Sequence, residues 1–559
     1  TKIEELSKKL NCHPVIANLL LQRGITSSEQ AQSFFYPSLN MLHDPFLMKD
    51  MDKAVERLDR AIAQDEKILI YGDYDVDGTT AVSLLYKYLK HHCNNDNLEY
   101  YIPDRYTEGY GVSIKGIDYA AENGFSLMLI TDCGIKAVEK VKYANSKQVD
   151  IIICDHHTPG DTLPEAIAVL QRPDCPYPYK WLSGCGVSFK LVQAHSLKHN
   201  LPMSELYKLL DLLCVSIASD IVPITGENRI LAYFGLQQLN SNPSLGLKTI
   251  IKISGIDKEI TINDIVFRIG PRINAAGRVE SGRKSVELLT ADEKCSAAGI
   301  ASDINTFNDQ RKKLDHDITE EAIRHINQSE LEPSKKTTVL FNANWHKGVI
   351  GIVASRLTES FYRPTIILTE SNGLATGSAR SVEGFDLYYA ISQCSEFLEN
   401  YGGHKYAAGL TLKIENIEPF KQKFERIVRE TIDDEMLTPQ INIDAKIKLT
   451  DITPDLYHML QKFAPFGPNN TIPVFMTEKV TNFIGTKRVG RNNEHLKLVI
   501  VDDTRACNDR SGIGFGMGHL YDKVNSGGFF DICYTLQENE FMGKNDIQMI
   551  VKDIRLREE

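Results

Sequence analysis

Residues 68–80, Ile-Leu-Ile-Tyr-Gly-Asp-Tyr-Asp-Val-Asp-Gly-Thr-Thr, decide the fold of this chain. Three carboxylates, Asp73, Asp75 and Asp77, alternate directly after an apolar strand pattern and before a helical pattern. Like charges this close repel one another and raise each other's pKa unless a cation lies among them. The stretch therefore predicts a divalent-metal site at the end of a strand.

An EF-hand loop is the alternative interpretation, because the same carboxylates fill its first six positions. That loop needs a Glu at position twelve and a helix in front of it. Position twelve is Leu84, and residues 67–71 predict a strand, so an EF-hand is excluded. A strand, loop and helix that carry carboxylates fit instead the crevice at the carboxyl ends of the strands of a parallel α/β sheet.

The bulk composition is that of a globular protein with several domains. At 559 residues, 42% apolar and 25% charged, the chain is too long for one core. The chain has no membrane-length apolar run and no signal-peptide pattern, so we expect a cytoplasmic protein without membrane contact. Eleven scattered cysteines without a C-x-x-C pair predict neither disulfides nor a zinc ribbon. The net charge of −11 disfavours a generic nucleic-acid coat protein, although local basic surfaces remain compatible with it.

The pattern of strands and helices predicts an α/β protein with two lobes and a terminal barrel. Strand candidates at 67–71, 98–102, 126–130, 150–154 and 167–170 alternate with helices, which predicts βαβ units and a mainly parallel sheet. We expect five segments: a helical lead-in (1–60), a first α/β lobe (61–285), a long helix (286–330), a second α/β lobe (331–435) and an all-β barrel (436–559).

Polar clusters follow several strands of the first lobe. Asp132 follows the third strand, Asp155, His156 and His157 follow the fourth, and Asp220 closes an apolar helix. Each alone has an ordinary interpretation as a helix cap or a loop histidine. Because the carboxyl ends of parallel strands share one edge of a sheet, we expect these groups to converge. Oxygen-rich ligation with one imidazole suits Mn²⁺ or Mg²⁺ better than zinc.

A basic stretch at residues 270–284 predicts a Gly/Arg-rich loop. It holds Arg272, Arg278, Arg283 and Lys284 against a single acid, Glu280. A solvated charged loop is the plain interpretation. Since guanidinium forks match phosphate oxygens, we favour a phosphate clamp.

The chain resembles a known superfamily in four ordered motifs. Asp-x-Asp-x-Asp-Gly at 73–78, Thr-Asp-Cys-Gly at 131–134, Asp-His-His at 155–157 and Ser-Asp at 219–220 are similar to those of the DHH phosphoesterases. The segments at 270–278, 377–381 and 402–409 narrow the resemblance to the RecJ family of bacterial single-strand-specific 5′ exonucleases. The resemblance covers nearly the whole chain and implies a DHH domain, a DHHA1 domain and an OB-fold for the three bodies.

The resemblance also implies roles for individual residues. Two Mn²⁺ or Mg²⁺ ions would be held by Asp73, Asp75, Asp132, His156 and Asp220, with Asp132 bridging. His157 would face the scissile phosphate, and Asp77 and Asp155 would orient the ligands. The DNA and its 5′-terminal phosphate would be bound by Arg105, Arg272, Arg278, Ser378, Arg380, His404 and Lys405.

The barrel carries a basic stretch of its own. Lys487, Arg488, Arg491, His495 and Lys497, with Phe483 nearby, predict either a platform for single strands or an exposed basic hairpin.

The resemblance implies a metal-dependent 5′→3′ exonuclease that hydrolyses single-stranded DNA to 5′-mononucleotides in DNA repair and recombination. The resemblance implies a monomer, with a single-strand-binding protein and a RecQ-type helicase as partners and no further domain after the barrel. A DHH phosphodiesterase for short oligonucleotides or cyclic dinucleotides is an alternative, but it leaves the barrel and the long helix unexplained. A non-catalytic DNA-binding scaffold is another, but it would have lost ligands, and all of them are present.

Overall fold

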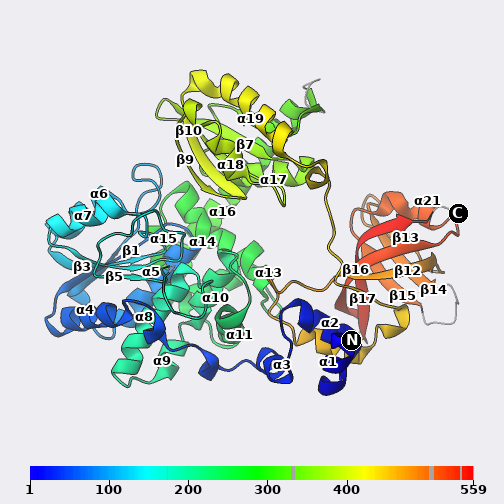
Figure 1. The fold of residues 1–559 in the computed structure, drawn as a ribbon, viewed down its shortest axis with the longest axis horizontal. Helices are drawn as coiled ribbons and strands as arrows, with labels where there is room; N and C mark the ends of the chain where they lie inside the picture. The colour runs from blue at the N-terminus through cyan, green and yellow to red at the C-terminus, as the bar shows by residue number, and fades with distance from the viewer. Residues whose placement is uncertain (173, 329–333, 503–508, 542–543, 558–559) are drawn as a thin grey trace.

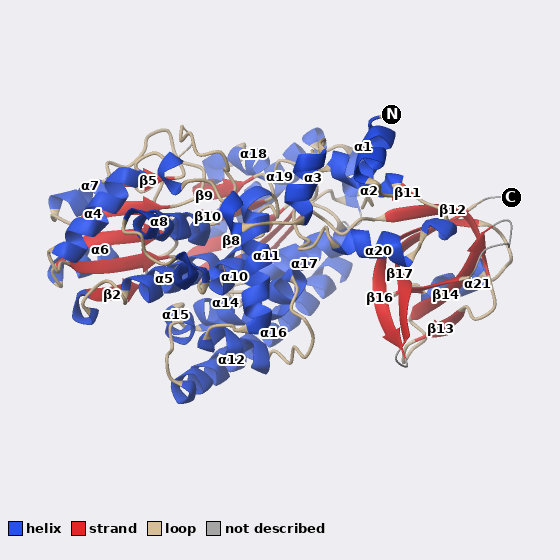
Figure 2. Cartoon of the chain, turned by 90° about the horizontal axis from the view of Figure 1, so that it is seen from below, coloured by secondary structure: helices blue, strands red, loops and turns tan. Residues whose placement is uncertain are grey.

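The computed structural model describes residues 1–172, 174–328, 334–502, 509–541 and 544–557. Figure 1 shows a first α/β lobe in blue to green at the left, a second α/β lobe in yellow-green above it, and a barrel in orange and red at the right. Figure 2 places the barrel strands β16 (Phe530–Phe541) and β17 (Lys544–Leu556) at one end of the molecule and the first-lobe sheet at the other.

The first lobe is built on five parallel strands in the order β2-β1-β3-β4-β5, which confirms the predicted parallel sheet. Its strands are nearly all apolar because helices cover both faces. One face packs against α4 (Met51–Ala63), α5 (Val76–Leu89) and α8 (Gly184–Lys198), and the other against α6 (Ile114–Glu122) and α7 (Val138–Ser146). The strands are β1 (Lys67–Gly72), β2 (Leu98–Tyr101), β3 (Phe125–Thr131), β4 (Asp150–Cys154) and β5 (Ala168–Leu170).

Ten α-helices in the described part of this lobe come before residue 270. They are α4 (Met51–Ala63), α5 (Val76–Leu89), α6 (Ile114–Glu122), α7 (Val138–Ser146), α8 (Gly184–Lys198), α9 (Met203–Tyr207), α10 (Leu210–Ser219), α11 (Gly226–Ser241), α12 (Leu245–Ile253) and α13 (Ile262–Asp264).

The stretch predicted as a Gly/Arg-rich loop is helical, so that prediction is wrong. It forms α14 (Gly270–Val279) and α15 (Arg283–Leu289). A Cβ on Gly277 would lie 2.6 Å from the carbonyl oxygen of Tyr74, and one on Gly270 would lie 2.7 Å from Ser219 Oγ. These glycines therefore serve the close approach of α14 to the acidic loop, and tertiary packing outweighs their low helix propensity.

The connecting helix α16 (Lys294–Gln328) has 35 residues and joins two cores. It begins eight residues after the predicted position 286, because α15 ends at Leu289. Ala297, Ala301 and Ile304 pack into the first-lobe core, and the later residues Ile318 and Ala322 pack against α17 (Ile350–Phe361) of the second lobe. Neither α16 nor any other helix among the described residues combines the length and the apolarity that a bilayer crossing requires.

The second lobe has a mixed sheet in the order β6-β7-β8-β10-β9. The β6–β7 pair is parallel and the other pairs are antiparallel. Its strands are β6 (Thr338–Phe341), β7 (Thr365–Ser371), β8 (Leu374–Arg380), β9 (Leu398–His404) and β10 (Ala407–Leu412), and its other helices are α18 (Leu387–Ser392) and α19 (Ile417–Thr431).

The C-terminal body is a barrel of seven strands in the order β11-β12-β16-β17-β15-β14-β13, as the strand-rich sequence predicts. A further pairing between β12 and β14 closes the five strands β12, β16, β17, β15 and β14 into a ring, and the short strands β11 and β13 flank it. The remaining elements are β11 (Ala445–Lys446), β12 (Phe475–Asn482), β13 (Lys487–Val489), β14 (His495–Asp502), β15 (Arg510–Gly514), α20 (Pro454–Gln461) and α21 (Tyr521–Val524).

The N-terminal helices belong to the barrel rather than to the first lobe. Residues of α1 (Lys2–Leu10), α2 (Pro14–Gln22) and α3 (Ser28–Phe35) share one core with residues 447–463 and the barrel strands. The predicted lead-in therefore divides, since α4 packs into the first-lobe core. Figure 1 shows these blue helices beside the red barrel, although they lie at opposite ends of the sequence.

Arg229 on α11 connects the first lobe to the barrel and to α3. Its side chain is 4% exposed and donates hydrogen bonds to four backbone carbonyls, those of Phe34, Lys462, Phe463 and Ala464, at 2.7–3.1 Å. Its guanidinium also lies 3.9 Å from the ring centroid of Phe34. One buried cation thus satisfies carbonyls from two segments that are distant in sequence.

We expect Arg229→Met to loosen the barrel from the first lobe. The substitution keeps the volume but leaves buried carbonyls without donors, which costs at least about 3 kcal/mol. Limited proteolysis in the connecting segment 438–444 and urea unfolding measure the effect. The exposed Arg60→Met is the control, and equal cleavage of the two variants would contradict the role of Arg229.

Candidate metal centre and nucleic-acid cleft

The groups that follow the first-lobe strands converge around one imidazole. His156 Nε2 lies 3.4 Å from Asp132 Oδ1, 3.5 Å from Asp220 Oδ2 and 3.7 Å from Asp77 Oδ2. Burial raises the pKa of Asp73, and the charge of Asp75 raises it further, so these two carboxylates interact. The acids come from the ends of β1, β3 and α10, and the imidazole follows β4.

Local backbone features direct the acids into this space. Asp75 caps α5, since its Oδ1 accepts a hydrogen bond from the Gly78 amide at 3.0 Å. Asp132 has a φ of 58°, a left-handed conformation that Asp tolerates better than most residues. A Cβ on Gly184 would lie 2.6 Å from Asp132 Oδ1, so only glycine leaves room for this carboxylate at the start of α8.

Asp77 is held by the N-terminus of α8. Its carboxylate accepts hydrogen bonds from the amides of Gly184 at 2.6 Å and Cys185 at 2.8 Å, and from Ser216 Oγ at 2.6 Å. Amide groups at a helix N-terminus favour an anion. These contacts fix Asp77 beside the other acids and leave it few free lone pairs.

Several buried polar atoms at this edge have no hydrogen-bond partner among the described residues. They include both carboxylate oxygens of Asp73, Asp132 Oδ1 and His156 Nε2. Burial, followed by the charge of Asp77, raises the pKa of Asp132 and brings that of Asp220 to about 9. Burial lowers the pKa of His156. Unpaired carboxylate oxygens beside a neutral imidazole are the donor set that a hard divalent cation requires, so these residues fit such an ion.

His157 and Asp155 form a pair next to this group. His157 Nδ1 lies 2.7 Å from Asp155 Oδ1, and Asp155 Oδ2 accepts a hydrogen bond from the Ile135 amide at 2.9 Å. Burial lowers the pKa of His157, but the hydrogen bond to Asp155 and the charges of Asp155, Asp77 and Asp75 together outweigh burial, so the pKa is raised. Nε2 of His157 points outward and lies 3.0 Å from the hydroxyl of Tyr110.

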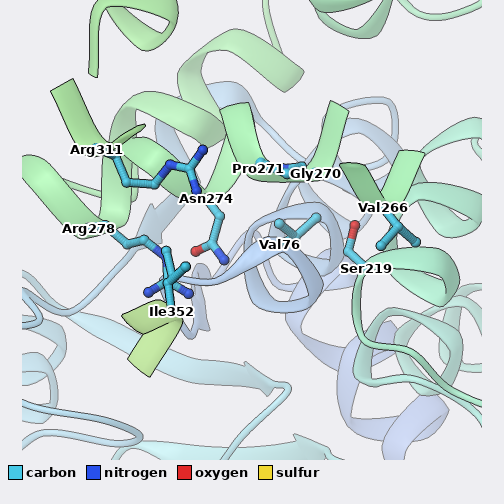
Figure 3. A pocket seen from close by; sticks show the side chains of 9 residues that line it. All are labelled: Val76, Ser219, Val266, Gly270, Pro271, Asn274, Arg278, Arg311 and Ile352. Atoms are coloured by element: carbon cyan, nitrogen blue, oxygen red, sulfur yellow. The ribbon is translucent and has the colours of Figure 1, made fainter. Parts of the chain in front are cut away.

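A cavity of about 220 Å³ lies between the first lobe, α16 and the second lobe. Figure 3 shows the side chains of Asn274, Arg278 and Arg311 on one side of it, with Ser219 and Val76 on the other. Ile352 of α17 closes it from the second lobe. Because Ser219 and Val76 neighbour the acids of the metal centre in sequence, the cavity joins that centre to the arginines.

Arg278 and Arg311 line this cavity, and Arg105 and Arg380 lie near enough to Arg278 to act on it. Burial and the charges of Arg105, Arg311 and Arg380 together lower the pKa of Arg278 to about 10. These groups come from both lobes and from α16. Anions stabilise a half-buried cluster of like charges such as this one, and phosphate oxygens match guanidinium forks.

The second-lobe residues of the predicted set face the same space. Arg380 donates a hydrogen bond to Ser378 Oγ at 3.0 Å, and a Cβ on Gly351 would crowd both side chains at 3.1–3.2 Å. Burial lowers the pKa of His404, and so do the charges of Lys136, His157 and His156. His404 therefore approaches the metal centre from the opposite lobe.

Three other predicted residues make different contacts. Arg272 donates to Asn305 Oδ1 at 3.1 Å and to the Arg268 carbonyl at 2.7 Å, so it ties α14 to α16 and does not line the cavity. Arg105 stacks 4.9 Å over the ring of Tyr74. The Nζ of Lys405 lies 5.4 Å from the ring centroid of Tyr406.

The barrel presents aromatic and basic groups together. Phe483 is 43% exposed, Phe515 is 61% exposed, and the ring of His495 lies 5.2 Å from that of Phe515. Lys487 lies directly opposite Lys497 across β13 and β14. Arg488 instead pairs with Asp522 at 2.6 Å.

Sequence reasoning missed two residues of the site. Arg311 lies in a polar stretch halfway along an otherwise amphipathic helix, and that interruption was the available signal. Tyr110 reaches His157 across a loop, and no periodicity or motif marks it.

Comparisons with known proteins match all three bodies. Residues 67–217 match the DHH family N-terminal domain, 334–430 the DHHA1 domain and 443–553 the RecJ OB domain. The single-stranded-DNA-specific exonuclease RecJ of Bacillus subtilis (strain 168) is 36% identical over 100% of this chain and 70% of its own length. That of Salmonella typhimurium is 31% identical over 97% and 96%. The crystal structure of Thermus thermophilus RecJ with Mn²⁺ superposes with a TM-score of 0.85 at 25% identity and covers 100% of this chain and 78% of that one.

We expect Mn²⁺ binding to release protons near pH 7. The pKa values of Asp73 and Asp132 are raised and that of Asp220 is about 9, so the metal-free folded chain holds protons that the unfolded chain, with Asp pKa values of about 3.9, has lost. Titration calorimetry in buffers of different ionisation enthalpy measures this release, and buffer-independent heats would contradict it.

The same shifts set the sign of the pH dependence of stability. Between about pH 4 and pH 9 Asp220 keeps a proton in the folded metal-free chain that it has lost in the unfolded chain, so the contribution of Asp220 to stability falls as the pH rises. Thermal unfolding in chelator therefore shows this decline, and added Mn²⁺ reduces it because the ion replaces the protons.

Proposed function

We propose that this chain, which belongs to the RecJ family of single-stranded-DNA-specific exonucleases, hydrolyses single-stranded DNA from the 5′ end in a metal-dependent reaction. One observation carries the proposal beyond family membership. Half-buried arginines and the buried acidic edge meet at one cavity between the lobes, which Arg278 and Arg311 line together with Val76 and Ser219, the sequence neighbours of the acids. That pairing suits a phosphodiester chain whose scissile phosphate meets metal ions while its terminal phosphate meets arginines.

In this proposal Asp73, Asp75, Asp132, His156 and Asp220 would hold two Mn²⁺ or Mg²⁺ ions. Bound ions of this kind activate water and neutralise charge on the phosphoryl oxygens. Asp77 keeps the acids in place through its bonds to the N-terminus of α8. Asp155 orients the ring of His157 through Nδ1, so Nε2 is free to contact the scissile phosphate once Tyr110 yields.

The arginines fix which phosphodiester bond of the DNA strand lies at the metal centre. Arg105, Ser378 and Arg380 bind the 5′-terminal phosphate, and Arg278 neighbours them. Because this site lies beyond the metal centre, one nucleotide leaves in each cycle as a 5′-mononucleotide. The remaining contacts to the strand come from His404 and Lys405 and, in the barrel, from the surface around Phe483 and Lys487. Arg272 acts here by positioning α14 rather than by touching phosphate.

The alternatives explain less of the molecule. A phosphodiesterase for short oligonucleotides or cyclic dinucleotides has no use for a barrel that is fastened to the catalytic lobe through Arg229. A non-catalytic scaffold has no need for buried carboxylates without partners, which destabilise a protein unless they serve a ligand. Comparing rates on a dinucleotide and a long strand separates the first alternative from the exonuclease.

We also propose an oligomeric state, a location and partners for this chain. The chain acts as a monomer in the cytoplasm, in DNA repair and recombination, and its single-stranded substrate points to a helicase and a single-strand-binding protein as partners. We keep 61–285, 286–330, 331–435 and 436–559 as the proposed domain bounds, and residues 1–60 divide between the barrel, whose core α1–α3 share, and the first lobe, whose core α4 joins.

We expect Asp132→Ala to abolish hydrolysis and to leave single-strand binding measurable. Removing the acid at the middle of the site leaves both ions poorly held, whereas the arginines and the barrel are untouched. Digestion of 5′- and 3′-labelled strands with Mn²⁺, Mg²⁺ or chelator gives the rate and the polarity. Retained Mn²⁺-dependent digestion would remove Asp132 from the metal centre.

We expect Arg380→Ala to weaken the preference for 5′-phosphorylated ends. A charge-assisted contact to phosphate contributes about 1.5–3 kcal/mol, which corresponds to roughly a 10- to 100-fold change in the ratio of rates on phosphorylated and hydroxyl ends. Arg356→Ala, on the same lobe but paired with Asp315, is the matched control. An unchanged ratio in Arg380→Ala would exclude this role.

A further inference from the structure

Two imidazoles and a carboxylate meet on the first lobe, far from the nuclease centre. Asp59 comes from α4, His195 from the last turn of α8, and His199 is the residue that caps the end of α8. Gly184 at the other end of α8 binds Asp77, and His195 lies eleven residues later, which is about 16 Å along the helix. This cluster is therefore separate from the acidic edge.

The distances in the cluster suit a tetrahedral metal ion. Asp59 Oδ1 lies 2.8 Å from His199 Nε2 and 3.4 Å from His195 Nε2, and the three atoms lie within 4.8 Å of one another. Metal–nitrogen bonds of about 2.0–2.1 Å give a tetrahedral site ligand–ligand distances of about 3.3 Å. The spacing of four residues on a helix places both rings on one face.

A second layer of contacts holds His195 in the orientation of a ligand. The hydroxyl of Tyr88 on α5 lies 2.7 Å from His195 Nδ1 and 2.8 Å from Ser196 Oγ. Metal-binding histidines in proteins usually engage their second nitrogen in such a bond, which fixes the ring. His195 is only 4% exposed, and its Nε2 faces the carboxylate of Asp59.

We propose that Asp59, His195 and His199 form a further metal site, for Zn²⁺ or a similar imidazole-preferring ion, with water as the fourth ligand. Two nitrogen ligands and one oxygen select such an ion over Mn²⁺ and Mg²⁺, which prefer oxygen. The ion connects α4 to α8 and, through Tyr88, to α5. Since α5 and α8 carry Asp75, Asp77 and Gly184 at their other ends, the site stabilises the helix pair on which the nuclease centre is built.

Lys198 distinguishes this proposal from a simple cluster of hydrogen bonds. Its Nζ lies 2.8 Å from Asp59 Oδ2, so it competes for the carboxylate and repels a cation, yet it leaves Oδ1 available. Lys198→Ala should therefore tighten metal binding, while His199→Ala should remove it. Hydrogen bonding alone predicts no metal dependence in either variant.

The test uses the full chain in excess Mg²⁺, which fills the oxygen-rich nuclease centre. Co²⁺ is titrated and followed by visible absorption, where a tetrahedral site absorbs strongly and an octahedral oxygen site weakly, and Zn²⁺ is then added to displace it. Thermal unfolding with and without Zn²⁺ gives a second readout. His316→Ala, an exposed histidine on α16, is the matched control.

We expect the unsubstituted chain and His316→Ala to show the tetrahedral spectrum and a higher melting temperature with Zn²⁺. His199→Ala should lose both, Tyr88→Phe should bind about 10- to 100-fold more weakly, and Lys198→Ala should bind more tightly. A spectrum and a Zn²⁺-induced shift that His199→Ala leaves intact would overturn the site, and so would the absence of both from the unsubstituted chain. Nuclease activity plays no part in this test, so its outcome is independent of the proposed exonuclease.

Discussion

Buried negative charge at the carboxyl edge of the first sheet is the constraint on which the rest of the structure depends. Asp73 and Asp132 lie almost fully out of solvent with oxygens that no described donor satisfies. Such groups are costly unless a cation joins them. The surrounding lobe is shaped to tolerate them, since Gly184 leaves room for Asp132 and the start of α8 supplies amides to Asp77.

The arginine cluster balances this charge from the other side of the cavity. Arg278 and Arg311 belong to the first lobe and the connecting helix, whereas Arg380 belongs to the second lobe. Neither sign is neutralised within its own cluster, so metal ions and a phosphate chain complete the electrostatics together. Helix α16 fixes the position of one lobe relative to the other, because its two ends pack into two different cores.

The barrel is attached to this machinery by contacts distant in sequence. Helices α1–α3 complete its core, and Arg229 fastens it to α11 through carbonyls of Phe34 and residues 462–464. A surface for single strands on the barrel is thereby held at a constant position relative to the catalytic lobe. Such an arrangement suits a long substrate that passes both bodies.

The sequence alone was enough to predict the parallel sheet and the acids at its edge. Strand periodicity is a local pattern, and the carboxyl ends of parallel strands lie at the same edge of a sheet. The sequence did not determine that residues 270–284 are helical, since their glycines serve contacts to Tyr74 and Ser219 that exist only in the folded lobe. Nor did it determine the partners of Tyr110, Arg311 or the N-terminal helices. These depend on which surfaces meet across hundreds of residues, and only tertiary packing decides that.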